Sequence, residues 1–276
     1  MLGWSGLKAT ALALALVLLL MYGYHSLMWH WEFGGPVKNA LVALTAAELE
    51  MPHLDGTVEV IATRQRIGSR EIAAMLPMER MESSFLVWRL GGVANAAATA
   101  MGVDRRHHVA NAFLEGYVPF PVTSPWMAWH VIAQRKKYMF DHVQYAGLRD
   151  VWQTSKQAFH FTRGDCEDHA ILLADWLIGE GYDAWVAVGT VQGQGHAWVV
   201  LFDANGTEYL LEATRKRRLR GLHRLPLTLS HTEYHPRMRF NRDQFWYNTG
   251  LPLTTAYRSS QWRMQSRFHR ALAGQF

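Results

Sequence analysis

Cys166 is the only cysteine among 276 residues, so no disulfide bond within the chain can hold its fold together. The fold must rest on a buried core instead, and hydrophobic residues make up 49% of the sequence, which is enough for a substantial one. The thiol then has three uses: as a nucleophile, as one ligand of a metal site, or as a small buried apolar group. A histidine downstream, His196, is a candidate partner for a nucleophilic thiol, so the first use is tested below.

An apolar segment near the N-terminus predicts a membrane anchor. Residues 7–28 contain one lysine, Lys8, and no acidic residue, and about 20 apolar residues span a bilayer as a helix. Aromatic residues gather between Tyr22 and Trp31, as they do at a membrane–water interface. No small-residue cleavage site follows, so residues 1–31 are expected to be an uncleaved transmembrane anchor rather than a cleaved signal peptide or a buried helix.

The distribution of positive charge predicts the orientation of this anchor. The N-terminus and Lys8 are positive, and the next lysine or arginine beyond the apolar segment is Lys38. Because positive flanks stay in the cytoplasm, most of the chain should lie outside the membrane, which in a bacterium is the periplasm. An unpaired cysteine suits that oxidising compartment. The sequence thus predicts a single-pass inner-membrane protein with a periplasmic domain.

The chain after the anchor divides into two further parts. Residues 32–118 predict a mainly helical segment without a chemical signature, because Ala, Leu and Glu dominate residues 37–51 and residues 84–100 are apolar and Ala-rich. Residues 119–276 hold every residue that is a candidate for catalysis. Within this second part, residues 126–145 predict an amphipathic helix with a basic face.

Cys166 falls in the first turn of a predicted helix. A glycine and an aspartate precede it, and apolar residues then recur on one helical face. The helix dipole and the free N–H groups of a first turn favour a thiolate over a thiol. Three neighbouring acids, Asp165, Glu167 and Asp168, oppose that ionisation by like-charge repulsion, so a positive partner is needed. His196 is the candidate, forming a thiolate–imidazolium pair.

The three acids have two interpretations. Asp165 can cap the helix by accepting the N–H of Asp168, while Asp168 reaches back to the N–H of Asp165, as in a capping box. Acidic side chains packed this closely can also hold Ca²⁺ through oxygen ligands. The residues alone leave both interpretations open.

Three antiparallel strands are predicted after the helix, and they decide which acid can orient His196. The strands are residues 182–191, 195–203 and 207–213, joined in a meander. Side chains alternate along a strand, so Asp203 faces away from His196 although the two share a strand. Glu212, on the next strand, is therefore the candidate.

The register of the last hairpin settles the face of Glu212. A two-residue turn would pair Glu212 with Val199, on the face away from His196. A three-residue loop with a left-handed Gly206 pairs Glu212 with Trp198 instead, diagonally from His196 at roughly 7–8 Å between backbone positions. A glutamate side chain bridges that distance to the imidazole. The catalytic interpretation therefore requires the three-residue loop.

These segments resemble a known superfamily. They are Gly164-Asp165-Cys166-Glu167-Asp168-His169-Ala170, Gly195-His196-Ala197-Trp198-Val199 and Leu211-Glu212-Ala213-Thr214. They are similar to the transglutaminase-like superfamily, and most similar to its bacterial transglutaminase-like cysteine proteinases, over residues 120–215. The resemblance implies an α+β fold with a papain-like core, in which a helix that carries the cysteine packs on an antiparallel sheet. The helical segment and the transmembrane helix would precede this core.

The resemblance also implies roles for the three site residues. Cys166 would be the nucleophile, His196 the general base and acid, and Glu212 the residue that orients His196, where the family usually has Asp. The reaction would be acyl transfer through a thioester, with the backbone N–H of Cys166 as one oxyanion donor. Gln153 or Trp152 would be the second donor.

The resemblance further implies a bound metal ion. Family members that release biofilm adhesins are periplasmic and bind calcium beside the nucleophile. Asp165 and Glu167 match those calcium positions. Ca²⁺ is therefore the expected cofactor.

The predicted function is a membrane-anchored periplasmic cysteine peptidase or acyltransferase that acts on a protein or peptide. The alternative is a non-catalytic scaffold or binding module of a membrane complex. The dense basic cluster Arg215–Arg220 is expected to form a solvated loop or to contact anionic lipid or an acidic protein. The remaining basic residues are dispersed and the net charge is only +5, so no nucleic-acid partner is expected.

Overall fold

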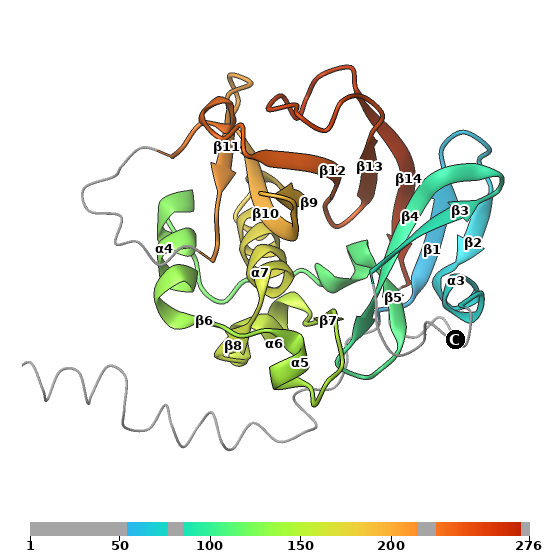
Figure 1. Ribbon diagram of the computed structural model, residues 1–276, viewed down its shortest axis with the longest axis horizontal. Coiled ribbons are helices and arrows are strands. Elements are labelled where there is room, and N and C mark those ends of the chain that lie inside the picture. Colours follow the sequence, from blue (N-terminus) through green and yellow to red (C-terminus); the bar gives the residue numbers. More distant parts are fainter. Residues whose placement is uncertain (1–53, 77–84, 215–224, 272–276) are drawn as a thin grey trace, which may run out of the picture. The chain divides into compact units, whose positions relative to one another are not determined.

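An eight-stranded antiparallel sheet organises the residues that the computed structural model describes, which are 54–76, 85–214 and 225–271 (Figure 1). The strand order is β11-β10-β9-β12-β13-β14-β1-β2. The strands are β1 Gly56–Val60, β2 Arg66–Gly68, β9 Asp183–Val191, β10 Gln194–Phe202, β11 Glu208–Leu211, β12 Tyr234–Phe240, β13 Gln244–Asn248 and β14 Trp262–Arg270. The predicted meander is confirmed, since β9, β10 and β11 are neighbours in this order.

Helix α7 (Cys166–Gly179) packs against strands β9 and β10 of this sheet, and Figure 1 shows it alongside them in yellow. Every side chain from Glu167 to Leu177 is buried. The segment is rich in Leu and Ala and lacks Gly and Pro before Gly179, which favours a helix. Helices α4 (Pro125–Arg135) and α6 (Ser155–His160) pack against α7. The prediction that a helix begins at Cys166 is confirmed.

The two faces of strand β10 belong to two different cores. Ala197, Val199 and Leu201 pack under α7, whereas the residues between them face an aromatic cluster on the other side of the sheet. Arg239 is buried in that cluster, with its guanidinium carbon 4.4 Å from the ring centre of Trp185. Because side chains pack against both faces of β10, this strand is held rigidly in the sheet.

The remaining described elements form two smaller sheets and several short helical segments. A four-stranded sheet contains β3 (Leu86–Leu90), β4 (Val93–Gly102), β5 (His107–Val109) and β7 (Val151–Trp152), and strands β6 (Lys137–Tyr138) and β8 (Arg163–Gly164) pair with each other. The other helical segments are α3 (Ser69–Ala74), α5 (Asp141–Gln144), η2 (Ala110–Phe113) and η3 (Thr228–Ser230).

Two predicted helices are wrong. Residues 84–100 form most of the β3–β4 hairpin, because Gly91 and Gly92 take φ values of +57° and +79° and reverse the chain in a tight turn. The small alanines of β4 then fit between packed layers, where most of them are buried. Residues 126–145 form only the helix α4 before Lys136, after which the chain enters β6 and then the single turn of α5.

The predicted fold class is wrong: the α+β fold with a papain-like core, a helical segment and a transmembrane helix is replaced by a structure that is mostly β-sheet among the described residues. The described part of residues 32–118 is mainly β-structure, and more of the described residues lie in strands than in helices. None of the helices within those residues has the length and apolar character to cross a membrane. The predicted anchor, residues 1–31, and the predicted helix at 37–51 lie outside the described residues.

The carboxylate of Asp175 fastens α7 to the chain around it. Asp175 is fully buried, and its Oδ2 accepts hydrogen bonds from the backbone N–H groups of Gly116 and Tyr117, both at 2.9 Å, and from the Ser155 hydroxyl. Its Oδ1 accepts from Arg242 Nε at 2.6 Å. One carboxylate therefore ties the helix to three separate segments, and the buried Ser155 hydroxyl would lose this acceptor without it.

Replacing Asp175 should destabilise the fold strongly. We expect Asp175→Ala to lower the free energy of unfolding by about 2–4 kcal/mol, because it removes the acceptor of the buried Ser155 hydroxyl, of two backbone N–H groups and of the partly buried Arg242. Urea unfolding monitored by tryptophan fluorescence measures the change. Arg66→Ala, which removes an exposed ion pair with Glu59, is the control and should leave stability nearly unchanged. An Asp175→Ala protein as stable as the control would contradict this role.

Candidate functional site

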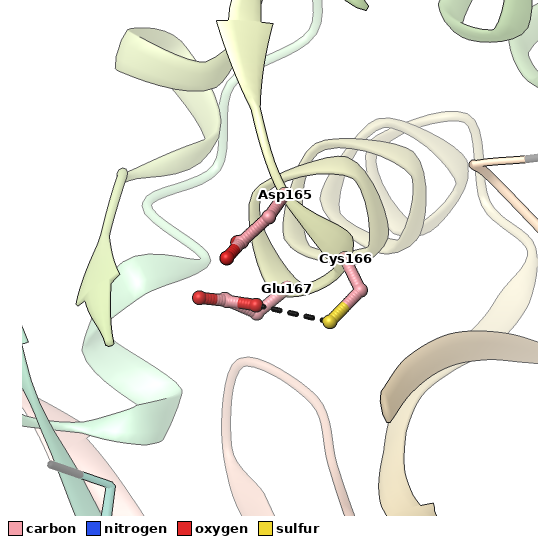
Figure 2. A group of neighbouring side chains, drawn as sticks. All are labelled: Asp165, Cys166 and Glu167. Carbon is pink, nitrogen blue, oxygen red and sulfur yellow. Dashed lines mark hydrogen bonds between the residues drawn. The ribbon is translucent and has the colours of Figure 1, made fainter. Parts of the chain in front are cut away.

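Cys166 is the first residue of α7, and only the N-cap residue Asp165 separates it from the short strand β8. Its side chain is partly exposed, and its Sγ lies 3.2 Å from Glu167 Oε2 (Figure 2). The free N–H groups of the first helical turn surround this position, which favours a negative charge on sulfur. The predicted location of the thiol is therefore confirmed.

His196, on strand β10, interacts with the Cys166 thiol and with Glu212. Its Nε2 lies 2.7 Å from Glu212 Oε2, which leaves Nδ1 as the ring nitrogen for the thiol. The imidazole also stacks on Trp198, with ring centres 6.1 Å apart. The fold thus brings together the cysteine and histidine that the sequence paired.

The hairpin that carries Glu212 has the register that the site requires. Val199 pairs with Leu211, so Glu212 comes opposite Trp198, and the N–H of Asp203 donates to the carbonyl of Thr207 at 3.0 Å. The loop between them has three residues, and the φ of Gly206 is +81°. The predicted three-residue loop is confirmed, and the two-residue turn is wrong.

Four hydrogen bonds hold the Glu212 carboxylate. Oε1 accepts from the backbone N–H of Thr214 at 3.0 Å and from its hydroxyl at 2.7 Å. Oε2 accepts from the Tyr234 hydroxyl at 2.8 Å, besides its bond to His196. Glu212 is one methylene longer than the Asp of the expected pattern, and these contacts fix the position of the longer side chain. Its geometry is therefore determined by the protein rather than by solvent.

The histidine and the glutamate favour each other's charged forms. Burial lowers the pKa of His196, but its contacts with Cys166 and Glu212 outweigh burial and raise that pKa to about 10. Burial likewise opposes ionisation of Glu212, yet His196 and then Thr214 lower the pKa of Glu212 to about 2. At neutral pH the pair is imidazolium and carboxylate, the state that stabilises a thiolate on Cys166.

The predicted calcium residues lie beside the thiol. Side-chain ligand atoms of Asp165, Cys166 and Glu167 lie within 4.8 Å of one another (Figure 2). Burial, and then the neighbouring Cys166 and Asp165, raise the pKa of Glu167 well above its usual value. In this geometry the Cys166 thiol donates a hydrogen bond to Glu167 Oε2. The capping interpretation is supported too, since Asp168 Oδ2 accepts from the N–H of Asp165 at 3.3 Å. The calcium assignment stays a prediction.

Both candidates for the second oxyanion donor are engaged elsewhere. Gln153 Nε2 donates to the hydroxyl of Tyr145 at 2.9 Å and to the carbonyl of Arg163 at 3.0 Å, which uses both amide hydrogens. Trp152 is buried and its indole N–H donates to Asp150. Neither side chain is therefore available to a developing oxyanion in this conformation.

Three residues of the site escaped the sequence analysis. Tyr234 and Thr214 brace Glu212, and Tyr138 interacts with Cys166. Tyr234 reaches the site because β12 pairs with β9 after a long connection. No local sequence pattern predicts this pairing. Thr214, by contrast, is the last residue of the segment Leu211-Glu212-Ala213-Thr214, and a hydroxyl two residues after a glutamate is a local signal for this contact.

The arrangement supplies the parts of a nucleophilic thiol. The helix start and the imidazolium favour the thiolate, and the Glu212 carboxylate holds the imidazole in one orientation. Such a thiolate can attack an electrophilic carbon, after which the imidazolium can return its proton to the group that leaves. This chemistry follows from the contacts among three side chains, whatever the identity of the reacting molecule.

Comparisons with known proteins show what part of this chain is similar to. Residues 150–266, which contain all three site residues, match the family model described as CEP76 peptidase-like domain. A stretch of 73 residues is 40% identical to the protein named centrosomal protein of 76 kDa in Pongo abelii and in Mus musculus, and 61 residues are 43% identical to that of Homo sapiens. These stretches cover 26%, 26% and 22% of this chain, but only 11%, 11% and 9% of the relatives' lengths.

These findings overturn the predicted resemblance and the localisation drawn from it. The matches point to the CEP76 family and not to bacterial transglutaminase-like cysteine proteinases. The predicted membrane-anchored periplasmic peptidase or acyltransferase in an inner membrane is therefore wrong, since the relatives are named as centrosomal proteins. The error has a physical origin: a Cys–His–acid arrangement recurs in unrelated proteins and identifies a type of site rather than a family.

Removing the charge of Glu212 should lower the pKa of His196. We expect Glu212→Gln to reduce this pKa by about 1–3 units, because the neutral amide no longer stabilises the imidazolium. A pH titration followed by NMR of labelled histidine, assigned with a His196→Ala protein, measures the shift. Glu59→Gln on β1 is the control and should not move the His196 resonance. An unchanged His196 pKa in Glu212→Gln would contradict the assigned coupling.

Proposed function

We propose that this chain carries a peptidase-like, protein-binding domain in which Cys166, His196 and Glu212 form a reactive thiol site. The proposal is carried by two linked contacts. The Cys166 thiol interacts with His196, and His196 Nε2 lies 2.7 Å from Glu212 Oε2. The bracing of Glu212 by Tyr234 and Thr214 supports it, because a merely structural carboxylate would not need one fixed orientation toward an imidazole. The proposal places the chain neither in a membrane nor in the periplasm.

A protein is the proposed partner. The relatives are named for the centrosome, a protein assembly, and the matched family model is named as peptidase-like, which supports recognition of a polypeptide. Tyr138, which interacts with Cys166, is 39% exposed, and Phe140, whose ring contacts that of Tyr138, is 56% exposed. Tyr138 pairs with Gly164 on the strand that leads into Cys166. Apolar side chains of a bound segment would find contacts on this rim.

The basic cluster adds a finer proposal about this partner. Residues Arg215–Arg220 lie outside the described residues, between the end of the Glu212 hairpin and Leu225. Their sequence position, close after Glu212, supports an acidic protein segment as the partner. The earlier expectation of a lipid contact depended on the membrane anchor and is not retained.

Cys166 should react selectively with a small alkylating probe. In the native protein at neutral pH we expect iodoacetamide to label Cys166 at least about tenfold faster than in the His196→Ala protein, because the imidazolium stabilises the thiolate. Intact-mass spectrometry measures the rate, and Cys166→Ser is the blank. His231→Ala removes a histidine that pairs with Glu233 and should react like the native protein. Equal rates in the native and His196→Ala proteins would remove the basis for a reactive thiol.

Polypeptide recognition should be visible as faster labelling by an electrophile that a peptide carries. We expect an electrophile on a short peptide with an apolar side chain to label Cys166 faster than the same electrophile on a methyl group. The preference should shrink in Phe140→Ser, while labelling by iodoacetamide stays unchanged, since Phe140 is exposed and outside the Cys166–His196–Glu212 series. Equal rates for the two electrophiles in the native protein would count against a polypeptide partner at this site.

A further inference from the structure

A second group of carboxylates lies beneath the thiol site. Asp141, on α5, joins Asp165 and Asp168 at the start of α7, and one oxygen from each lies within 4.8 Å of the others. All three are buried: Asp141 is 3% exposed and Asp168 is fully enclosed. Three negative charges gathered out of water are unfavourable unless something positive balances them.

Hydrogen bonds satisfy only some of these oxygens. Asp168 accepts from the N–H of Gln153 at 2.8 Å and from that of Asp165. Asp141 Oδ2 accepts from the N–H of Val151. Asp141 Oδ1 and Asp165 Oδ1, in contrast, are buried without a hydrogen-bond donor among the described residues. Two carboxylate oxygens in one small space are thus left available as ligands.

The one buried cation nearby does not fill this role. Lys136 is 1% exposed, and its charge attracts Asp168 and Asp165. Its Nζ, however, donates to the carbonyls of Ala158 at 2.7 Å and Phe161 at 3.2 Å and to Gln153 Oε1 at 3.3 Å, so its hydrogen bonds go to neutral oxygens and not to the carboxylates. One lysine against three aspartates leaves an excess of two negative charges when all are ionised.

We infer that Asp141, Asp165 and Asp168 form a site for a hard divalent cation, with Ca²⁺ as the fitting ion. Calcium takes several oxygen ligands and tolerates irregular geometry, whereas a thiol is a poor ligand for it. The set therefore fits Ca²⁺ better than the pair Asp165 and Glu167, which includes a carboxyl committed to the Cys166 sulfur. The cation would tie α5 to the start of α7 and add positive charge near the thiol.

Binding of Ca²⁺ alone tests this site without any readout of thiol chemistry. The full chain, freed of metal with a chelator, should bind Ca²⁺ with a stoichiometry of one in isothermal titration calorimetry. Excess Ca²⁺ should also raise the midpoint of thermal unfolding by several degrees, because a ligand that binds only the folded state stabilises it. Absence of binding heat and of a midpoint shift in the native protein would overturn the inference, whatever the variants do.

Three variants separate the ligand sets. Asp141→Asn should weaken Ca²⁺ binding at least about tenfold, while Cys166→Ser and Glu167→Gln should bind within about threefold of the native protein. Loss of binding in Glu167→Gln with retention in Asp141→Asn would overturn the assignment in favour of Asp165 and Glu167. Because Cys166→Ser has no thiol, Ca²⁺ binding by this variant is measured independently of the proposed thiol site.

Discussion

The packing of α7 against strands β9 and β10 is the constraint on which the rest of the structure depends. The helix is buried from Glu167 to Leu177, so it can sit in only one way between the sheet and the helices α4 and α6. Asp175 fixes its position along its own axis through bonds to separate segments. With the helix immobilised, the thiol at its first residue is held against the histidine of β10.

The site then combines one local and one distant contribution. The helix start and the β10–β11 hairpin are short-range features, and they bring Cys166, His196 and Glu212 together. Tyr234 arrives from β12, which lies across β9 in the sheet, and completes the bracing of the carboxylate. A change in the packing of β12 would therefore reach His196 through Glu212, although Tyr234 itself does not bond to the imidazole.

The predictable part of this molecule is the part with local causes. Helix periodicity after Cys166, side-chain alternation in β10 and the left-handed Gly206 were enough to predict the helix start, the strand of His196 and the correct hairpin register. A helix was wrongly predicted for residues 84–100 because alanines favour helices. The described part of this segment forms strands because of the Gly91–Gly92 turn and the layers that pack around it. Tyr234 and Asp141 were out of reach, since their roles come from contacts across the fold. Family and localisation could not be predicted either, because a thiol site does not specify either of them.

The direct test of a preformed thiolate uses the fact that Cys166 is the only cysteine. A thiolate absorbs in the far ultraviolet where a thiol does not, so the difference between the native protein and Cys166→Ser reports this one sulfur. At neutral pH we expect a clear thiolate absorbance in the native protein and a large loss of it in His196→Ala, with both proteins folded by circular dichroism. A native spectrum that matches Cys166→Ser at neutral pH would contradict the account.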